Sequence, residues 1–192
     1  MIRLIRIVTL FALTACAVYA DETPTHEHLA DLLKVKLRTV QHMALNPVLV
    51  GAVLEQNQEQ LSLDVIKRRD EDWKASKELT DMKRQLMASR AAELLRGTIG
   101  DGSTFTEAFL TDNKGANVAV FPPTSDYWQG DEEKWTAAWA DGNGEMFIGP
   151  LEYDESTNIY AVQISAPVKD GTDTIGVLVV GVSVDYVSGR HQ

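Results

Sequence analysis

One segment of the sequence gathers side chains that could bind a small molecule. Residues 124–139 read TSDYWQGDEEKWTAAW, which places tryptophans and a tyrosine among acidic residues and one lysine. Aromatic walls with a few fixed polar groups are what a small-molecule pocket needs. A second interpretation exists, because Trp135 and Trp139 lie one helical turn apart and such a stripe also fills the core over a sheet. The residues alone leave pocket and core both open.

Other candidate chemistry is weaker. His26 and His28 flank Glu27 near the N-terminus, but no third metal ligand follows nearby in the sequence. A Ser-His-Asp triad would have to use His42, and the sequence has no nucleophile-elbow motif. The acidic residues of 126–133 could pair as general acid and base, but nothing in the sequence sets their pKa values apart. We therefore predict a protein that is not an enzyme and holds no metal or cofactor.

The first twenty residues, MIRLIRIVTLFALTACAVYA, have the layout of a secretory signal peptide. Two arginines precede an apolar stretch, which is shorter than the roughly 20 residues of a membrane-spanning helix. We predict cleavage after Ala20, a mobile mature N-terminus over residues 21–26 and a periplasmic protein. The alternative is a lipoprotein anchored at Cys16, because Leu13 to Cys16 resembles a lipobox.

Charge and cysteine content narrow the remaining classes. The chain has 192 residues and a net charge of −10, and removing the two signal-peptide arginines leaves 16 basic against 28 acidic residues, or −12. A nucleic-acid-binding domain needs a basic face, so we predict no nucleic-acid partner. The single cysteine excludes an internal disulfide framework. The length fits one domain.

The elements that would position the aromatic segment fall into two parts. Residues 27–97 show helical apolar spacing, and Asn46-Pro47 either ends the first helix and starts a second at Val48 or kinks one continuous helix. Ser62 can cap a short helix that runs to about Trp73, and a further helix covers residues 80–96 with Gly97 just after its end. Residues 98–187 are rich in glycine, β-branched and aromatic residues, which predicts strands. Helices followed by strands indicate an α+β fold.

Five strands are predicted, over residues 105–111, 117–121, 145–153, 159–168 and 174–184. The last strand is apolar on both faces, which predicts a central position with both faces covered. We expect the N-terminal helix to cover one face and residues 124–144 to cover the other. In strand 159–168, Tyr160 and Val162 face one side, whereas Gln163 and Ser165 face the other.

Three stretches carry a family resemblance: DNKGANVAVFPPTSDYWQGDEEKW, FIGPLEYDEST and VQISAPVKDGTDTIGVLVVGVSVDYV. Together they resemble the extracytoplasmic, PAS-like sensor family called Cache, in its single-Cache form. The resemblance implies a long N-terminal helix, additional helices and a five- or six-stranded antiparallel sheet. It assigns residues 27–187 to one Cache domain and leaves residues 188–192 as a C-terminal tail.

The resemblance also implies a pocket between the sheet and the segment after the second strand. Its lining would comprise Asp126, Tyr127, Trp128, Trp135, Phe147, Tyr160, Gln163 and Ser165. Asp126 would hold an ammonium group, and Gln163 and Ser165 would bind a carboxylate or amide. Residues 98–189 contain no arginine and only three lysines. The expected ligand is therefore an amino acid, an amine or a neutral metabolite.

Two functions are compatible with these features. The first is a periplasmic small-molecule sensor that passes its ligand state to a membrane receptor partner. The alternative is a structural or protein-interaction module whose pocket is filled by aromatic side chains. In either case the amphipathic N-terminal helix could form a homodimer.

Overall fold

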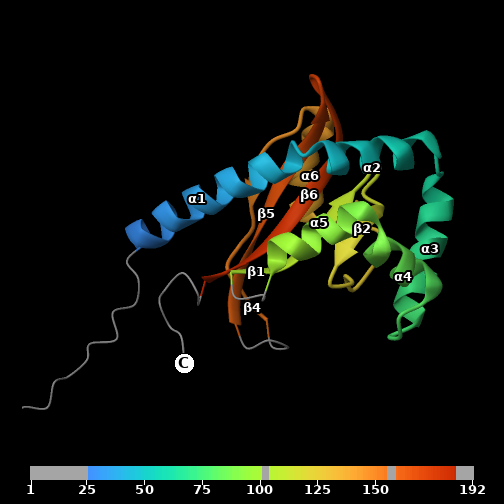
Figure 1. Cartoon of the computed structure of the whole chain (residues 1–192), viewed down its shortest axis with the longest axis horizontal. Coiled ribbons are helices and arrows are strands. Elements are labelled where there is room, and N and C mark those ends of the chain that lie inside the picture. The colour runs from blue at the N-terminus through green and yellow to red at the C-terminus, as the bar shows by residue number, and fades with distance from the viewer. Residues whose placement is uncertain (1–25, 101–103, 155–158, 185–192) are drawn as a thin grey trace, which may run out of the picture.

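The computed structural model describes residues 26–100, 104–154 and 159–184. The signal peptide, most of the predicted N-terminal segment 21–26 and the tail 188–192 lie outside these residues. The described residues form an α+β fold with helices on both faces of one antiparallel sheet (Figure 1). None of the described helices is long and apolar enough to cross a membrane.

The helical part begins as local capping chemistry predicts. Asn46 caps α2 by accepting a hydrogen bond from the Val48 amide at 2.9 Å, and Ser62 caps α3 through the Val65 amide. The break at Asn46-Pro47 and the Ser62 cap are therefore confirmed. The helices are α1 His26–Ala44, α2 Pro47–Gln58, α3 Leu63–Ala75, α4 Asp81–Ala88, α5 Arg90–Ile99 and α6 Glu133–Trp139, and a 3-10 turn spans Ala140–Gly142.

The single helix predicted over residues 80–96 is wrong, because Ser89 divides it into α4 and α5. Ser89 has extended backbone angles, and its hydroxyl accepts a hydrogen bond from the Ala92 amide at 3.1 Å. A serine side chain competes with helical backbone bonding and so favours a cap over a helix interior. Gly97 lies inside α5, which ends at Gly100 with a positive φ.

The sheet has the order β2-β1-β6-β5-β3, with β4 also paired to β5. Its strands are β1 Phe105–Thr111, β2 Asn117–Phe121, β3 Phe147–Ile148, β4 Glu152–Asp154, β5 Ile159–Asp170 and β6 Asp173–Ser183. The central position of the last strand is confirmed. The predicted strand 145–153 is instead two short strands, because the connection between them contains Pro150, which has no amide to donate.

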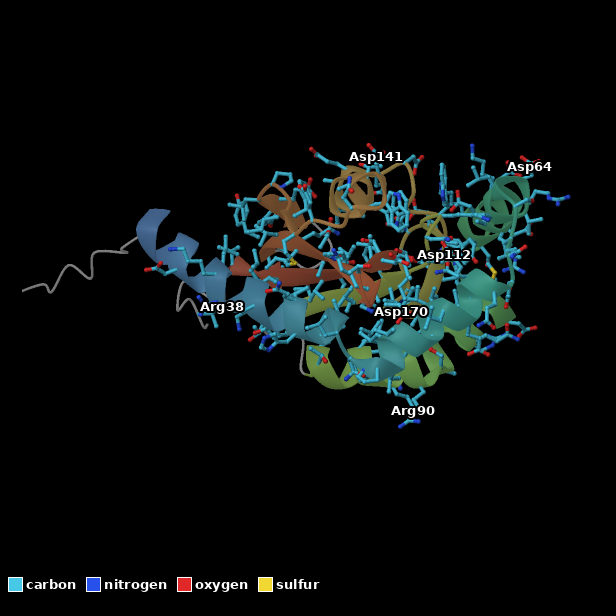
Figure 2. The ribbon with its side chains drawn as sticks, turned by 90° about the horizontal axis from the view of Figure 1, so that it is seen from above. Arg38, Asp64, Arg90, Asp112, Asp141 and Asp170 are labelled. Atoms are coloured by element: carbon cyan, nitrogen blue, oxygen red, sulfur yellow. The ribbon has the colours of Figure 1, made fainter. Side chains whose placement is uncertain are left out.

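Each sheet face has its own core. Helices α1, α2 and α5 cover the face that presents Ile164, Leu178 and Val180. The opposite face presents Phe109, Val177 and Val179 and is covered by α3 and the segment containing α6. Figure 2 shows the sheet between the α5 side, marked by Arg90, and the segment marked by Asp141. The predicted cover of both faces is confirmed.

Candidate functional site

The space between the sheet and α6 is packed with aromatic side chains. Trp135 is 7% exposed, and its indole Nε1 donates to Thr111 Oγ1 at 3.0 Å. Its ring stacks on Trp139 with centroids 5.3 Å apart. Helix α6 begins after Glu132, and no side chain caps its first turn. Trp135 therefore belongs to the core on this face, together with Ile66, Trp73, Phe109, Tyr127, Ala138, Val177 and Val179.

The start of the aromatic segment is held by α3. Asp70, almost fully buried, accepts hydrogen bonds from the amides of Tyr127 at 2.8 Å and Trp128 at 3.1 Å. Its other oxygen lies 2.7 Å from Lys74 Nζ, and this hydrogen bond raises the pKa of Lys74, so the ammonium stays charged at neutral pH. Asp70 thus fixes the backbone at the edge of the sheet next to β2.

Asp126 and Trp128 make internal contacts in this region. The Asp126 carboxylate accepts from Gln129 Nε2 at 2.5 Å and lies 3.8 Å from Lys74 Nζ. The Trp128 indole donates to the Lys114 carbonyl at 2.8 Å, and Lys67 Nζ lies 4.9 Å from the ring centroid. These two side chains hold the segment in place at the β2 edge, far along the sheet from β5.

An open cleft lies on the same face of the sheet as α6, next to the part that α6 covers. Glu107 of β1, Gly181 of β6 and Gln163 of β5 are neighbours in register across three strands. Gln163 Nε2 donates to Glu107 Oε1 at 2.7 Å, passing over the glycine. A Cβ at Gly181 would lie 2.5 Å from Thr106 Oγ1 and 2.8 Å from Glu107 Cγ, so any larger residue would force these side chains to move. We call this cavity of about 490 Å³ the sheet cleft.

The walls of the sheet cleft come from the β3–β4 connection and from Pro122. Gly149, Pro150 and Glu152 line it, and they also line a smaller hollow of about 170 Å³ that adjoins Phe147 and Lys134. The Gly149 amide donates to the Gln163 carbonyl at 2.8 Å, which fixes the connection against β5.

The electrostatic character of the sheet cleft is acidic. Glu107 and Glu152 line it, and no lysine or arginine is among the described residues that do so. Lys134 borders the adjoining hollow, but its ammonium lies 2.7 Å from Glu132. A charge-assisted hydrogen bond to a carboxylate is among the stronger polar contacts available to a ligand. The cleft therefore suits a ligand with a positive group.

The eight residues predicted to form one pocket lie in several places. Gln163 lies on the floor of the sheet cleft, and Phe147 borders the adjoining hollow. Ser165 is fully buried next to them in β5, and its hydroxyl has no hydrogen-bond partner among the described residues. Tyr160 is exposed on the opposite face, with its ring centroid 4.9 Å from that of Tyr153. The remaining four belong to the aromatic segment described above.

Of the residues that line the sheet cleft, only Gln163 was among the predicted site residues, and Glu107 and Gly181 on the floor were missed. Glu107 precedes a buried stretch of β1, and Gly181 interrupts the apolar run of β6. The sequence signals for these two residues were an acidic side chain in β1 and a glycine within a buried strand. Only the strand register, which the sequence does not show, places the two residues next to each other.

Comparisons with known proteins bear on the fold. No protein-family model and no curated protein matches the chain. Among solved structures, the sensor domain of the Vibrio cholerae histidine kinase DctB matches with a TM-score of 0.50 and 15% identity, over 86% of this chain and 55% of that domain.

Two chemoreceptor ligand-binding domains also match, each over little more than half of its own length. That of Pseudomonas aeruginosa PctB, solved with L-Arg, matches with a TM-score of 0.45 and 16% identity over 85% of this chain and 52% of that one. That of Pseudomonas fluorescens CtaA, solved with L-serine, gives 0.44 and 12% over 83% and 54%.

The helices, the six-stranded antiparallel sheet and the likeness to the DctB domain define the class as a PAS-like sensor-domain fold. The structure is that of a single Cache-like domain, which confirms the sequence resemblance at the level of fold. At these identities the likeness concerns fold alone.

Proposed function

We propose that the chain is a periplasmic, non-enzymatic small-molecule-binding domain of sensor type. In this proposal residues 1–20 are its signal peptide, residues 27–187 form the domain, and a membrane receptor partner reads its ligand state. The observation that carries the proposal is the sheet cleft, where Gln163 and Glu107 meet over Gly181. The ligand site would be this cleft and the hollow beside Phe147, with Ser165 beneath it.

The chemistry of the sheet cleft favours a ligand with an ammonium group. Because the Gln163 amide nitrogen donates to Glu107, the orientation of the amide is fixed, and its oxygen remains as a hydrogen-bond acceptor. An ammonium has three donors, and Glu107, Gln163 and Glu152 offer acceptors around the same cavity. Of the predicted ligand classes, amines and amino acids bound through their ammonium group therefore fit better than neutral metabolites.

Thermal unfolding of the purified chain with matched probes tests the ligand class. The probes are 1-butylamine and 1,4-diaminobutane, with 1-butanol as the neutral counterpart of the first. A ligand at about 100 times its dissociation constant stabilises a protein by about 2.7 kcal/mol. For a chain of this length the unfolding midpoint then rises by roughly 5–11 °C. An amine-specific rise supports the proposal, and an equal rise with 1-butanol contradicts it.

A pair of charge-matched variants places the ligand. Glu107→Gln removes one of the two carboxylates that line the cleft, the one on its floor, and should weaken amine binding about tenfold or more. Glu93→Gln makes the same charge change at an exposed position of α5, which covers the other face of the sheet. This variant should leave amine affinity unchanged. Equal affinity in the two variants would place the ligand elsewhere.

The packed aromatic core on the α6 side specifically favours a second candidate function. A space filled by Trp135 and Tyr127 suits a protein-interaction module of the same fold. In this alternative α1 would form a homodimer, since Val35 on it is 60% exposed. No response to any amine, together with a dimer in sedimentation equilibrium that Val35→Glu dissociates, would favour the interaction module.

A further inference from the structure

A second cleft lies away from the sheet cleft, between α2, α3 and α4. It has a volume of about 360 Å³ and is lined by Gln56, Glu59, Arg69, Met82, Gln85, Leu86 and Tyr127. We call it the helical cleft, and we propose that it binds the carboxylate of a small aliphatic monocarboxylic acid through Arg69 and Tyr127. It shares no residue with the sheet cleft and does not depend on the function proposed above.

Arg69 has far more hydrogen-bonding capacity than its surroundings use. Its Nη1 lies 3.5 Å from Tyr127 Oη, and it makes no ion pair with any acidic residue that the structure describes. Arg84 of the next helix shows the contrast, because its guanidinium pairs with Asp81 at 2.6 Å. A guanidinium presents five N–H donors in a planar fork that matches a carboxylate. Most of the Arg69 fork is available to a ligand in the cleft.

Tyr127 supplies a second donor at a fixed position. The residue is 2% exposed, and burial raises the pKa of its phenol, so the hydroxyl keeps its proton at neutral pH. The oxygen accepts from Arg69, which leaves the hydroxyl hydrogen to donate. The ring cannot easily move, because Asp70 holds the Tyr127 amide and the Trp73 ring centroid lies 6.0 Å from its own.

The floor next to these donors is also polar. Nε2 of Gln56 is buried and completes no hydrogen bond among the described residues. It lies near the Asp112 carboxyl, whose pKa is raised by burial, and the Gln56 amide offsets part of that rise. The hydrogen-bond donors of Arg69, Tyr127 and Gln56 are therefore not all paired with acceptors among the described residues.

The other residues that line the helical cleft restrict the class of ligand that fits it. Met82 and Leu86 of α4 are partly buried apolar side chains that border the cleft, which fits a short aliphatic chain. Glu59, an exposed residue, also lines the cleft and acts electrostatically on Tyr127. A second carboxylate on the ligand would meet this negative charge, so monocarboxylates should bind better than dicarboxylates. The volume is at the lower end for small-molecule pockets, which start at about 300 Å³.

Titration with butyrate and its uncharged isostere butyramide tests the proposal, with nuclear magnetic resonance of the ¹⁵N-labelled chain as the readout. Butyrate should shift the resonances of Tyr127 and Arg69 saturably, and butyramide should bind at least tenfold more weakly. Succinate should also bind more weakly than butyrate. Absence of saturable shifts with butyrate, or equal affinities for butyrate and butyramide, would overturn the proposal.

Variants separate the site from general effects of charge and folding. Arg69→Gln should weaken butyrate binding at least tenfold, whereas Arg68→Gln, an equal charge change at the exposed neighbour, should leave it within twofold. Tyr127→Phe keeps the buried ring and should weaken binding severalfold, which tests the site even if Arg69→Gln does not fold. Undiminished binding by Arg69→Gln, or by a folded Tyr127→Phe, would contradict the assignment.

Discussion

Replacing Asp70 tests how the helical part holds the aromatic segment. One Asp70 oxygen accepts both the Tyr127 and Trp128 amides, and the other pairs with half-exposed Lys74. Asp70→Asn keeps an oxygen for the two amides and loses the ion pair. Asp70→Ala loses all three contacts and leaves the buried Tyr127 amide without its acceptor. The two variants therefore separate the backbone hydrogen bonds from the ion pair.

The two substitutions should lower the free energy of unfolding by different amounts. A buried donor left without an acceptor costs about 1–3 kcal/mol, so losing the partner of both amides should cost Asp70→Ala about 3–5 kcal/mol. The ion pair of Asp70 is solvated only on its half-exposed Lys74 side. Surface ion pairs contribute about 0–1 kcal/mol, so Asp70→Asn should cost about 1 kcal/mol, at the upper end of that range. The expected difference in the free energy of unfolding between the variants is therefore about 2–4 kcal/mol.

Urea unfolding followed by circular dichroism measures this difference by linear extrapolation. Asp72→Ala is the matched control, because it removes an exposed carboxylate from the same helix, and it should change stability by no more than about 0.5 kcal/mol. If Asp70→Ala and Asp70→Asn unfold within about 1 kcal/mol of each other, the amide hydrogen bonds do not hold the segment as described.

Further substitutions test burial, packing and the cleft floor. Burial raises the pKa of Asp112, so the free energy of unfolding should fall as the pH rises through that raised pKa and the carboxyl ionises. Asp112→Asn should remove this pH dependence in urea unfolding, and an unchanged pH dependence would contradict this. Trp135→Ala should cost about 3–5 kcal/mol in the same assay, and a loss below about 1 kcal/mol would mean that the ring is not core. Gly181→Ala should weaken amine binding in calorimetry by occupying the floor, and unchanged affinity would place the ligand elsewhere.

Local features of the fold could be predicted from the sequence. Asn46 and Ser62 act within a few residues of their own positions, so their caps follow from residue type and spacing. The central position of β6 follows from the apolar residues that it presents on both faces of the sheet. Ser89 was missed because a serine is compatible with both a helix interior and a cap, and the surrounding packing decides between them.

The site depends on contacts that the sequence does not display. Gln163 and Glu107 are 56 positions apart, and only strand register brings them together over Gly181. Because residues 98–189 contain few cationic side chains, the sequence predicted that the ligand is not an anion. The described lining of the sheet cleft likewise contains no lysine or arginine. The inference overlooks Arg69, however, which the helical part places against Tyr127. The composition of one half of a fold does not limit what the other half contributes.

Side-chain amide resonances give the most direct test of ligand binding in the sheet cleft. Titrating the ¹⁵N-labelled chain with 1-butylamine should shift the Gln163 side-chain amide and the Gly181 backbone amide saturably, because both lie on the cleft floor. The Trp135 indole resonance should stay unchanged, since its proton is held by Thr111 in the core. Shifts concentrated at the Trp135 indole, with none at Gln163, would contradict binding in the sheet cleft.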